Sequence, residues 1–324
     1  MTNFRLIMMG TGPFAAPTLE ALYGSMHAVL ALVTQPARPA HRHRAPLGAP
    51  LRELAARHAT PVLDPDSVNT DAARAALAAF APDLFVVADY GQILSPETLA
   101  IAKLGGLNLH GSLLPRYRGA APINWAIYHG DRETGVTVIH MTPRVDAGPC
   151  LAQARTPIDD DENAVELEAR LARMGAPLVC HAIDLLAAGR AESLPQDADL
   201  ACPARRLRKT DGAIDWSRPA AAIKNQVRAL EPWPKTYTFW RRNAGALRLI
   251  LGRTALRDDL PSAPPGTVVR ARGDELIVAC GQGLLAIREI QPAGKRMFTA
   301  GEFLRGYPLR DGQLFGPEER DSVP

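Results

Sequence analysis

The sequence has few cysteines and lacks the patterns that would employ them. Only four occur among 324 residues (Cys150, Cys180, Cys202 and Cys280), and none lies in a Cys-x-x-Cys pair. Neither a disulfide framework nor a zinc site is predicted, and free thiols in a reducing cytoplasm are expected. No apolar run approaches the ~18 residues of a membrane span. The apolar run of residues 4–9 is too short for a secretory signal, so we expect no membrane partner.

A complete dinucleotide-binding fingerprint is also missing. Gly10-Thr11-Gly12-Pro13 follows a predicted first strand over residues 5–9, but Ala15 stands where the third glycine would be. We therefore interpret these glycines as a tight turn from a strand into a helix.

Charge is unevenly spread along a chain of ordinary globular composition. The formal net charge is only +3, yet residues 203–324 hold 21 Lys and Arg against 13 Asp and Glu. The front part is acidic in balance. A basic C-terminal third can bind a polyanion, or it can be merely a basic solvated surface, and charge alone does not decide between them.

The pattern of apolar runs predicts two domains. Strands over residues 5–9, 28–33 and 84–88 alternate with helical stretches over 18–23, 47–58 and 70–80, which favours an α/β, Rossmann-like parallel sheet covered on both faces. A helix over 162–188 would close this domain. After a helix over 219–230, short β-like runs over 237–240, 246–251, 267–270, 275–279 and 284–290 predict a small closed OB-like β-barrel. The predicted bounds are 1–189, a linker over 190–209, and 210–324.

The most informative motif is the stretch from Asn108 to Gly119. Asn108 and His110 are two residues apart, so on a strand their side chains share one face. The turn residues that follow place this pair at a strand end, where sites form in open α/β sheets. An amide and an imidazole there, with a carboxylate such as Asp146 arriving from elsewhere, can polarise a carbonyl and move a proton. The motif predicts an acyl-transfer site.

Residues 108–115 resemble the signature of the 10-formyltetrahydrofolate-dependent formyltransferases. In that family, Asn, His and Asp at these places are catalytic, which implies that Asn108, His110 and Asp146 are catalytic here. Asn108 and a protonated His110 would stabilise the oxyanion, and Asp146 would orient His110. The resemblance implies 10-formyltetrahydrofolate as formyl donor and requires no metal.

Further motifs resemble the methionyl-tRNA branch of this family. They lie at residues 112–123 and 130–137, and in the C-terminal part at 211–216, 232–234 and 290–295. The glycinamide ribonucleotide branch lacks a C-terminal barrel. The resemblance therefore implies formyl transfer to the α-amino group of methionine on initiator tRNA, by a monomer.

The resemblance also implies where the folate lies. The expected donor-site residues are Tyr90, Gly91, Gln92, Ile93, Leu94, Ser112, Leu113, Leu114 and Pro115. Asp89 is a departure, since most relatives have a small residue there. We expect Asp89 to be a solvated or hydrogen-bonded turn residue.

The basic residues expected to contact tRNA lie in two segments. The first is a loop over residues 35–46, where relatives carry a basic insertion and this chain has Ala37 and alternating His and Arg. Arginine can bind phosphates or stack on splayed bases. The expected tRNA-binding residues are Arg38, Arg42 and Arg44 in this loop, and Arg205, Arg206, Arg208 and Lys209 in the linker.

Two alternative functions are open at this point. One is a formyltransferase acting on an amino sugar or nucleotide, and the other is a non-catalytic RNA-binding protein on the same scaffold. The complete set of Asn108, His110 and Asp146 speaks against the second. Only a partner with many phosphates would give a steep fall of affinity with salt.

Overall fold

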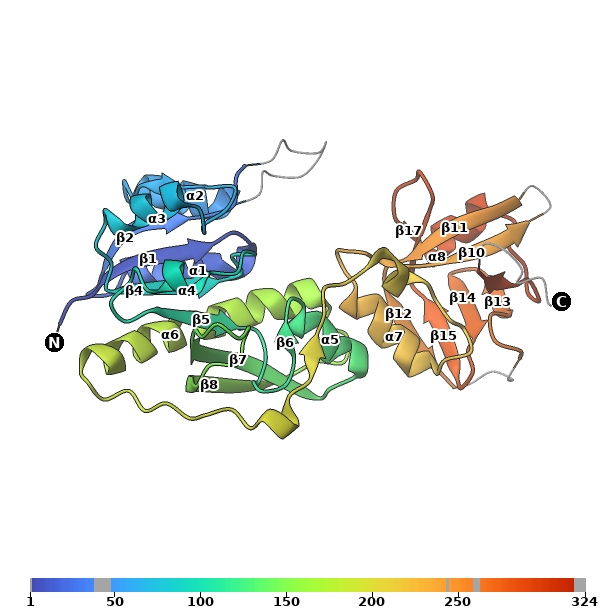
Figure 1. The fold of residues 1–324 in the computed structure, drawn as a ribbon. Coiled ribbons are helices and arrows are strands. Elements are labelled where there is room, and N and C mark those ends of the chain that lie inside the picture. Colours follow the sequence, from blue (N-terminus) through green and yellow to red (C-terminus); the bar gives the residue numbers. More distant parts are fainter. Residues whose placement is uncertain (1, 38–47, 243–244, 259–262, 318–324) are drawn as a thin grey trace. The chain divides into compact units, whose positions relative to one another are not determined.

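The computed structural model describes residues 2–37, 48–242, 245–258 and 263–317 (Figure 1). Contacts divide the chain into two compact units. The first comprises Met1–Pro122, Glu133–Pro157 and Glu166–Arg205, and the second comprises Ile123–Arg132, Ile158–Val165 and Arg206–Pro324. Segments 123–132 and 158–165 group with the second unit, because Asn124 donates to the Ala229 carbonyl and Asp161 pairs with Lys224.

The first unit is built around one seven-stranded sheet. Its strand order is β3-β2-β1-β4-β5-β7-β8, with parallel pairing from β3 through β5. The strands of this sheet are β1 (Arg5–Gly10), β2 (Ala28–Val33), β3 (Val62–Leu63), β4 (Leu84–Ala88), β5 (Gly106–His110), β7 (Glu133–His140) and β8 (Cys150–Pro157). The apolar runs of β1, β2 and β4 suit strands covered on both faces, and β4 is buried throughout.

The predicted fold class is confirmed for this unit, but one detail of it is wrong. The sheet is not wholly parallel, since β7 runs antiparallel to β5 and β8 antiparallel to β7. His110, the last residue of β5, pairs with Thr137. The segment between β5 and β7 re-enters the sheet at the edge where β5 ends. Strand β7 therefore runs in the direction opposite to β5.

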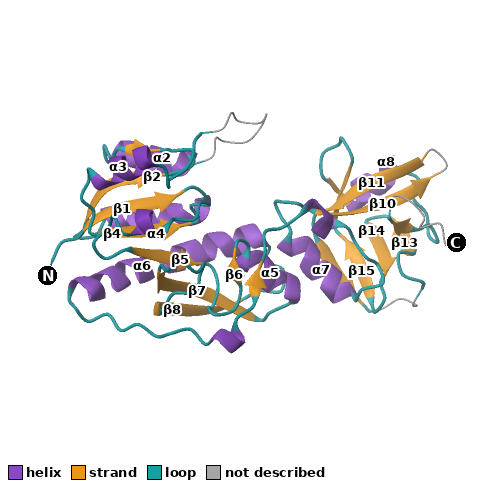
Figure 2. Cartoon of the chain, viewed as in Figure 1, coloured by secondary structure: helices purple, strands orange, loops and turns teal. Residues whose placement is uncertain are grey.

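Helices and short elements complete the first unit (Figure 2). They are η1 (Pro13–Ala15), α1 (Ala16–Tyr23), α2 (Ala49–Arg57), α3 (Asp71–Ala78), α4 (Pro96–Leu99), α6 (Ala164–Ala187), η2 (Ala198–Leu200), β6 (Arg118–Gly119) and β9 (Pro203–Ala204). Within the described ranges, no helix is both long and apolar enough to span a membrane.

The glycine stretch at the end of β1 forms a tight turn from a strand into a helix, as predicted. A Cβ on Gly10 would lie 2.6 Å from the Cβ of Ala15, so the side chain that glycine lacks would collide with the last residue of η1. The close approach of strand and helix therefore requires glycine at position 10.

The second unit has two antiparallel sheets. The sheets have the orders β17-β16-β11-β10-β18 and β12-β15-β14-β13. Their strands are β10 (Thr236–Arg242), β11 (Gly245–Leu251), β12 (Thr254–Arg257), β13 (Val268–Arg272), β14 (Glu275–Ala279), β15 (Leu284–Ile287), β16 (Glu289–Pro292), β17 (Phe298–Thr299) and β18 (Phe315–Gly316). The helical elements are α5 (Pro122–His129), η3 (Lys209–Gly212), α7 (Ala220–Ala229) and α8 (Ala300–Gly306).

The predicted small β domain is confirmed, with a correction to its strands. The run predicted as one strand over 284–290 divides at Arg288 into β15 and β16, which belong to different sheets. A bridge between Thr267 and Leu314 links the ends of β13 and β18, so the two sheets curve around one core rather than forming one regular barrel ladder.

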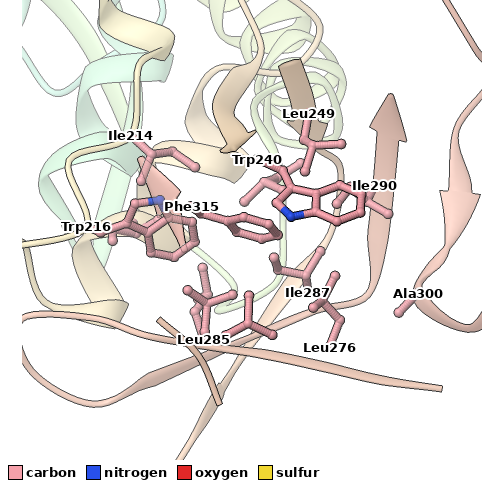
Figure 3. Close-up of a cluster of buried hydrophobic side chains, with 14 of the residues drawn as sticks. Ile214, Trp216, Trp240, Leu249, Leu276, Leu285, Ile287, Ile290, Ala300 and Phe315 are labelled. Carbon is pink, nitrogen blue, oxygen red and sulfur yellow. The ribbon is translucent and has the colours of Figure 1, made fainter. Parts of the chain in front are cut away.

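That shared core is rich in large apolar side chains (Figure 3). Trp240 on β10 and Leu249 on β11 come from one sheet, whereas Leu285 on β15 comes from the other. Trp240 is 2% exposed, and its indole ring meets the Phe303 ring edge-on. Burial of these side chains holds the two sheets together.

We predict that Trp240→Ala destabilises the second unit by about 3–5 kcal/mol, because a large cavity would open in this core. Trp240→Phe should cost much less, because the Trp240 indole N–H has no hydrogen-bond partner among the described residues and loses nothing there. Urea unfolding followed by circular dichroism would test this. Equal midpoints for the two variants would contradict the assignment.

Candidate active site

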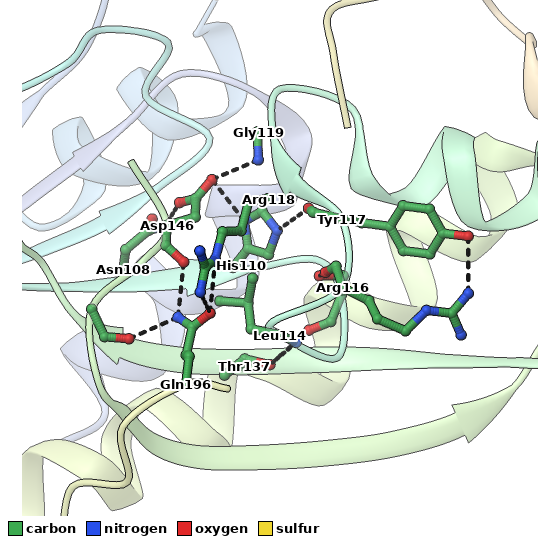
Figure 4. A network of polar contacts seen from close by, with 12 residues as sticks. Asn108, His110, Leu114, Arg116, Tyr117, Arg118, Gly119, Thr137, Asp146 and Gln196 are labelled. Carbon is green, nitrogen blue, oxygen red and sulfur yellow. Dashed lines mark hydrogen bonds and ion pairs between the residues drawn. The ribbon is translucent and has the colours of Figure 1, made fainter. Parts of the chain in front are cut away.

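Asn108 and His110 lie on one face of β5, as predicted (Figure 4). The intervening Leu109 points to the opposite face, where a Cβ on Gly175 of α6 would lie only 2.6 Å from its Cδ2. This contact fixes the sheet face on which each residue of β5 lies. His110 is 5% exposed and Asn108 is partly buried.

A backbone carbonyl orients the His110 imidazole. Nε2 lies 2.8 Å from the carbonyl oxygen of Tyr117, which can only accept, so Nε2 carries a hydrogen and donates it. Nδ1 is the nitrogen that faces Asp146, at 3.6 Å from Oδ2. That distance is too long for a hydrogen bond, so a proton on Nδ1 remains available to another acceptor.

The Asp146 carboxylate, in the segment between β7 and β8, contacts both β5 and the segment that follows β5. Oδ1 accepts from Nδ2 of Asn108 at 3.2 Å, and Oδ2 accepts from the backbone N–H of Gly119 at 2.9 Å. Asp146 has φ 51°, a left-handed conformation that is uncommon outside glycine. The structure therefore brings together all three residues predicted to be catalytic.

The Gln196 side chain supports the segment that carries Asp146. This role was not predicted from the sequence. Gln196 Nε2 donates to the carbonyls of Asp146 and Gly148, at 2.8 and 2.7 Å. Its Oε1 accepts two bonds from the Arg118 guanidinium, at 3.0 and 2.8 Å. Gln196 lies in the segment predicted as a linker, and a single glutamine there carries no recognisable signal.

The expected donor-site loop 112–115 is held by side chains of the two antiparallel strands. The Thr137 hydroxyl donates to the Ser112 carbonyl and accepts from the Leu114 N–H, at 2.7 and 3.1 Å. Gln153 donates to the Leu114 carbonyl at 3.1 Å. Ser112 is fully buried. The antiparallel β7 and β8 thus fix this loop, which lies beside the Asn108 and His110 pair.

The segment from Tyr90 to Leu94 leaves the carboxyl end of β4 beside the site. The Tyr90 carbonyl accepts from Thr11 Oγ1 and Gln35 Nε2, both at 3.0 Å. Gln92 Oε1 accepts from the Val68 N–H at 2.8 Å, so this side chain braces a neighbouring loop. Ile93 is 69% exposed. Among the expected donor-site residues from Tyr90 to Leu94, Ile93 is the one with a largely solvent-exposed side chain.

Asp89 is an exposed, hydrogen-bonded bend residue, in agreement with the solvated or hydrogen-bonded turn residue expected. It has φ 44°, and its carbonyl accepts from the N–H of Thr11 at 2.9 Å. Its carboxylate lies against Gly12, where a Cβ would be 1.6 Å from Oδ2. Although the residue as a whole is exposed, burial of its carboxyl group against Gly12 raises the pKa of Asp89 to about 6. Burial and the Asp89 charge raise the pKa of Glu168 to about 7.

Residues expected to bind tRNA are only partly within the described ranges. Arg38, Arg42 and Arg44 lie outside them. Arg205, Arg206, Arg208 and Lys209 are all exposed. No group of three or more His, Cys, Asp or Glu side chains among the described residues is arranged to hold a metal ion.

Asp89→Asn should stabilise the protein at neutral pH. Between about pH 4 and 6 the folded state keeps a proton that the unfolded chain has released, so the stability that the protonated form contributes is lost as pH rises. The thermal midpoint of the variant should exceed that of the native chain above about pH 6, and the gain should vanish near pH 4. The exposed Asp66→Asn is the matched control, and identical pH profiles for Asp89→Asn and native chain would contradict the assignment.

Comparison with known proteins agrees with this geometry. Two family models match, Formyl transferase over residues 3–183 and Formyl transferase, C-terminal domain, over residues 206–308. A methionyl-tRNA formyltransferase from Pelobacter propionicus is 45% identical over 316 residues, covering 98% of this chain and 97% of the relative. One from Rhodopirellula baltica is 42% identical, covering 96% of each chain.

A solved structure is also similar in fold. The N-formyltransferase from Helicobacter canadensis, in complex with folinic acid and dTDP-3-aminofucose, has a TM-score of 0.64 at 16% identity. The match covers 92% of this chain and 100% of that one. The resemblance inferred from the motifs is confirmed, and this chain belongs to the formyl transferase family.

Proposed function

We propose that this chain transfers the formyl group of 10-formyltetrahydrofolate to the α-amino group of methionine esterified to initiator tRNA. The observation that carries the proposal is the joining of Asn108, His110 and Asp146 at the end of β5. The similarity to methionyl-tRNA formyltransferases over nearly the whole chain supports this acceptor. A cytoplasmic monomer belongs to the same proposal, in keeping with four cysteines that are free thiols.

The reaction begins when the uncharged amine attacks the formyl carbon and an oxyanion develops. One hydrogen of the Asn108 amide is bound to Asp146, and the other is free, among the described residues, to meet the oxyanion. A proton on Nδ1 of His110 supplies a second donor, because Nε2 is committed to Tyr117. A donor of this kind contributes about 3 kcal/mol to transition-state stabilisation.

The second half of the reaction moves one proton. The new bond joins the amine nitrogen to the formyl carbon, and the bond that breaks joins that carbon to N10 of the folate. The amine loses a proton and N10 gains one. Asp146 is the base nearest to both donors, and its oxygens already accept from Asn108 and Gly119. We assign to Asp146 the relay of this proton through water, and the stabilisation of a charged His110.

Asn108→Ala and Asp146→Asn should each lower kcat by about a hundredfold or more, since each removes a group that acts in the transition state. Formylation of charged initiator tRNA measures the effect, with free methionine and amino sugars as competing acceptors. Asp71→Asn, an exposed carboxylate of the same unit, is the control. Near-native turnover by either variant with an intact fold would refute the catalytic assignment, and preference for a sugar amine would refute the acceptor.

Basic residues outside the catalytic cluster should govern the use of tRNA but not of folate. Arg42→Glu and Arg44→Glu should raise the KM for tRNA and leave the KM for 10-formyltetrahydrofolate unchanged. The slope of log affinity against log salt should become shallower by about 0.9 for each phosphate that the loop no longer neutralises. Arg190→Glu, an exposed charge of the catalytic unit, is the control. An unaltered KM for tRNA would exclude the loop over 35–46 from the RNA contact.

A further inference from the structure

The second unit contains a cavity that the proposed chemistry does not use. Its volume is about 590 Å³, within the range of pockets that take small ligands. The lining comes from β10, β11 and the segments beside them, namely Lys209, Trp233, Pro234, Tyr237, Phe239, Ala246, Leu247, Arg248 and Ala293. All of these residues belong to one compact unit.

Planar groups form much of the cavity wall. The Arg248 guanidinium lies 4.0 Å from the centre of the Tyr237 ring, and the Tyr237 and Phe239 rings meet at 90°. Phe239 and Arg248 are direct cross-strand partners on β10 and β11, so sheet register fixes their spacing. Trp233 is 44% exposed, although large aromatic side chains are usually buried. The cavity therefore presents π faces to solvent.

The charge of the lining is of one sign. Lys209 and Arg248 are both exposed, and among the described residues neither has an ion-pair partner. None of the described residues that line the cavity carries a carboxylate. Unpaired cations attract an anion, whereas the exposed rings favour a flat apolar partner. A nucleotide combines both properties in one group, and a phosphate ion or an aliphatic chain has only one of them.

The turn that carries Trp233 is held in place before any ligand binds. The N–H of Lys235 donates to the Leu230 carbonyl at 2.9 Å, which closes the turn. The Lys235 carbonyl lies so close to Gly212 that a Cβ there would be 2.1 Å from the oxygen. Ala293 donates to the Arg248 carbonyl at 3.0 Å and fixes the opposite wall. A preformed wall lowers the entropic cost of binding.

We propose that this cavity binds one unpaired nucleotide of the RNA acceptor, with its base on Trp233 and the Tyr237–Arg248 stack and its phosphate between Arg248 and Lys209. This inference rests on the proposed function. Bases within a duplex are already stacked on one another, so the nucleotide must come from an unpaired region or an end. The site binds RNA and takes no part in formyl transfer itself.

Tryptophan fluorescence tests the proposal directly. Trp125, Trp216 and Trp240 are 8%, 5% and 2% exposed, so Trp233 is the tryptophan that a ligand in solution can reach. Uncharged initiator tRNA and adenosine monophosphate should quench the emission of the full chain, whereas inorganic phosphate at equal concentration should not. Trp233→Phe should abolish the quenching and retain binding. Unchanged emission at saturating tRNA, or equal quenching by phosphate, would overturn the proposal.

Substitutions in the wall separate stacking from charge. Tyr237→Leu should weaken tRNA binding by about tenfold at an unchanged salt slope, and Tyr237→Phe should bind as the native chain does. Arg248→Gln should weaken binding and flatten the salt slope by the amount expected for about one phosphate. Arg272→Gln, an exposed arginine of the other sheet, is the matched control. A native dissociation constant for Tyr237→Leu, with its thermal midpoint unchanged, would overturn the proposal.

Failure of this proposal and failure of the proposed function give different results. If the chain formylates methionyl-tRNA and Tyr237→Leu has the native KM for tRNA, the cavity proposal fails and the function stands. If native chain binds tRNA with quenching but transfers no formyl group, the function fails and the cavity stands.

Discussion

The Asp146 carboxylate is the interaction on which the arrangement of the active site depends. It accepts from Asn108 on β5 and from the Gly119 N–H in the loop beyond, while its own residue lies in the turn after β7. Three chain segments therefore meet at two oxygen atoms. A carboxylate that is largely removed from water needs its lone pairs satisfied, and these two donors satisfy part of that requirement. Its removal would release the loops as well as remove a charge.

Backbone strain accompanies this arrangement. Asp146 and Tyr117 both have positive φ values, of 51° and 61°, and such conformations persist only where surrounding contacts impose them. For Asp146 the contacts come from Gln196, and for Tyr117 they come from Cys202, whose sulfur lies 3.2 Å from its N–H. The strand pair β6 and β9 lies in the same region. The segment before the second unit is thus part of the support of the site and not merely a connection.

The sequence predicts the reacting side chains better than it predicts their support. Alternation on a strand was sufficient to place Asn108 and His110 on one face, and the family pattern added Asp146. The orientation of His110 depends on the carbonyl of Tyr117, and every residue has a carbonyl, so no side-chain pattern marks it. The strand itself was predictable, but the antiparallel direction of β7 was not, because its apolar residues suit a parallel strand equally well.

The same limit applies to the cavity of the second unit. Residues 232–234 were recognisable as a motif, but the pairing of Phe239 with Arg248 is a matter of register between strands far from that motif. The residues proposed for catalysis can therefore be predicted from the sequence more readily than those proposed for acceptor binding. Two of the proposed catalytic groups, Asn108 and His110, are side chains of fixed chemical type in one short segment, whereas the cavity is lined by aromatic and basic residues from several segments that form no recognisable motif together. Only their juxtaposition by the sheet makes these residues a site for a flat anion.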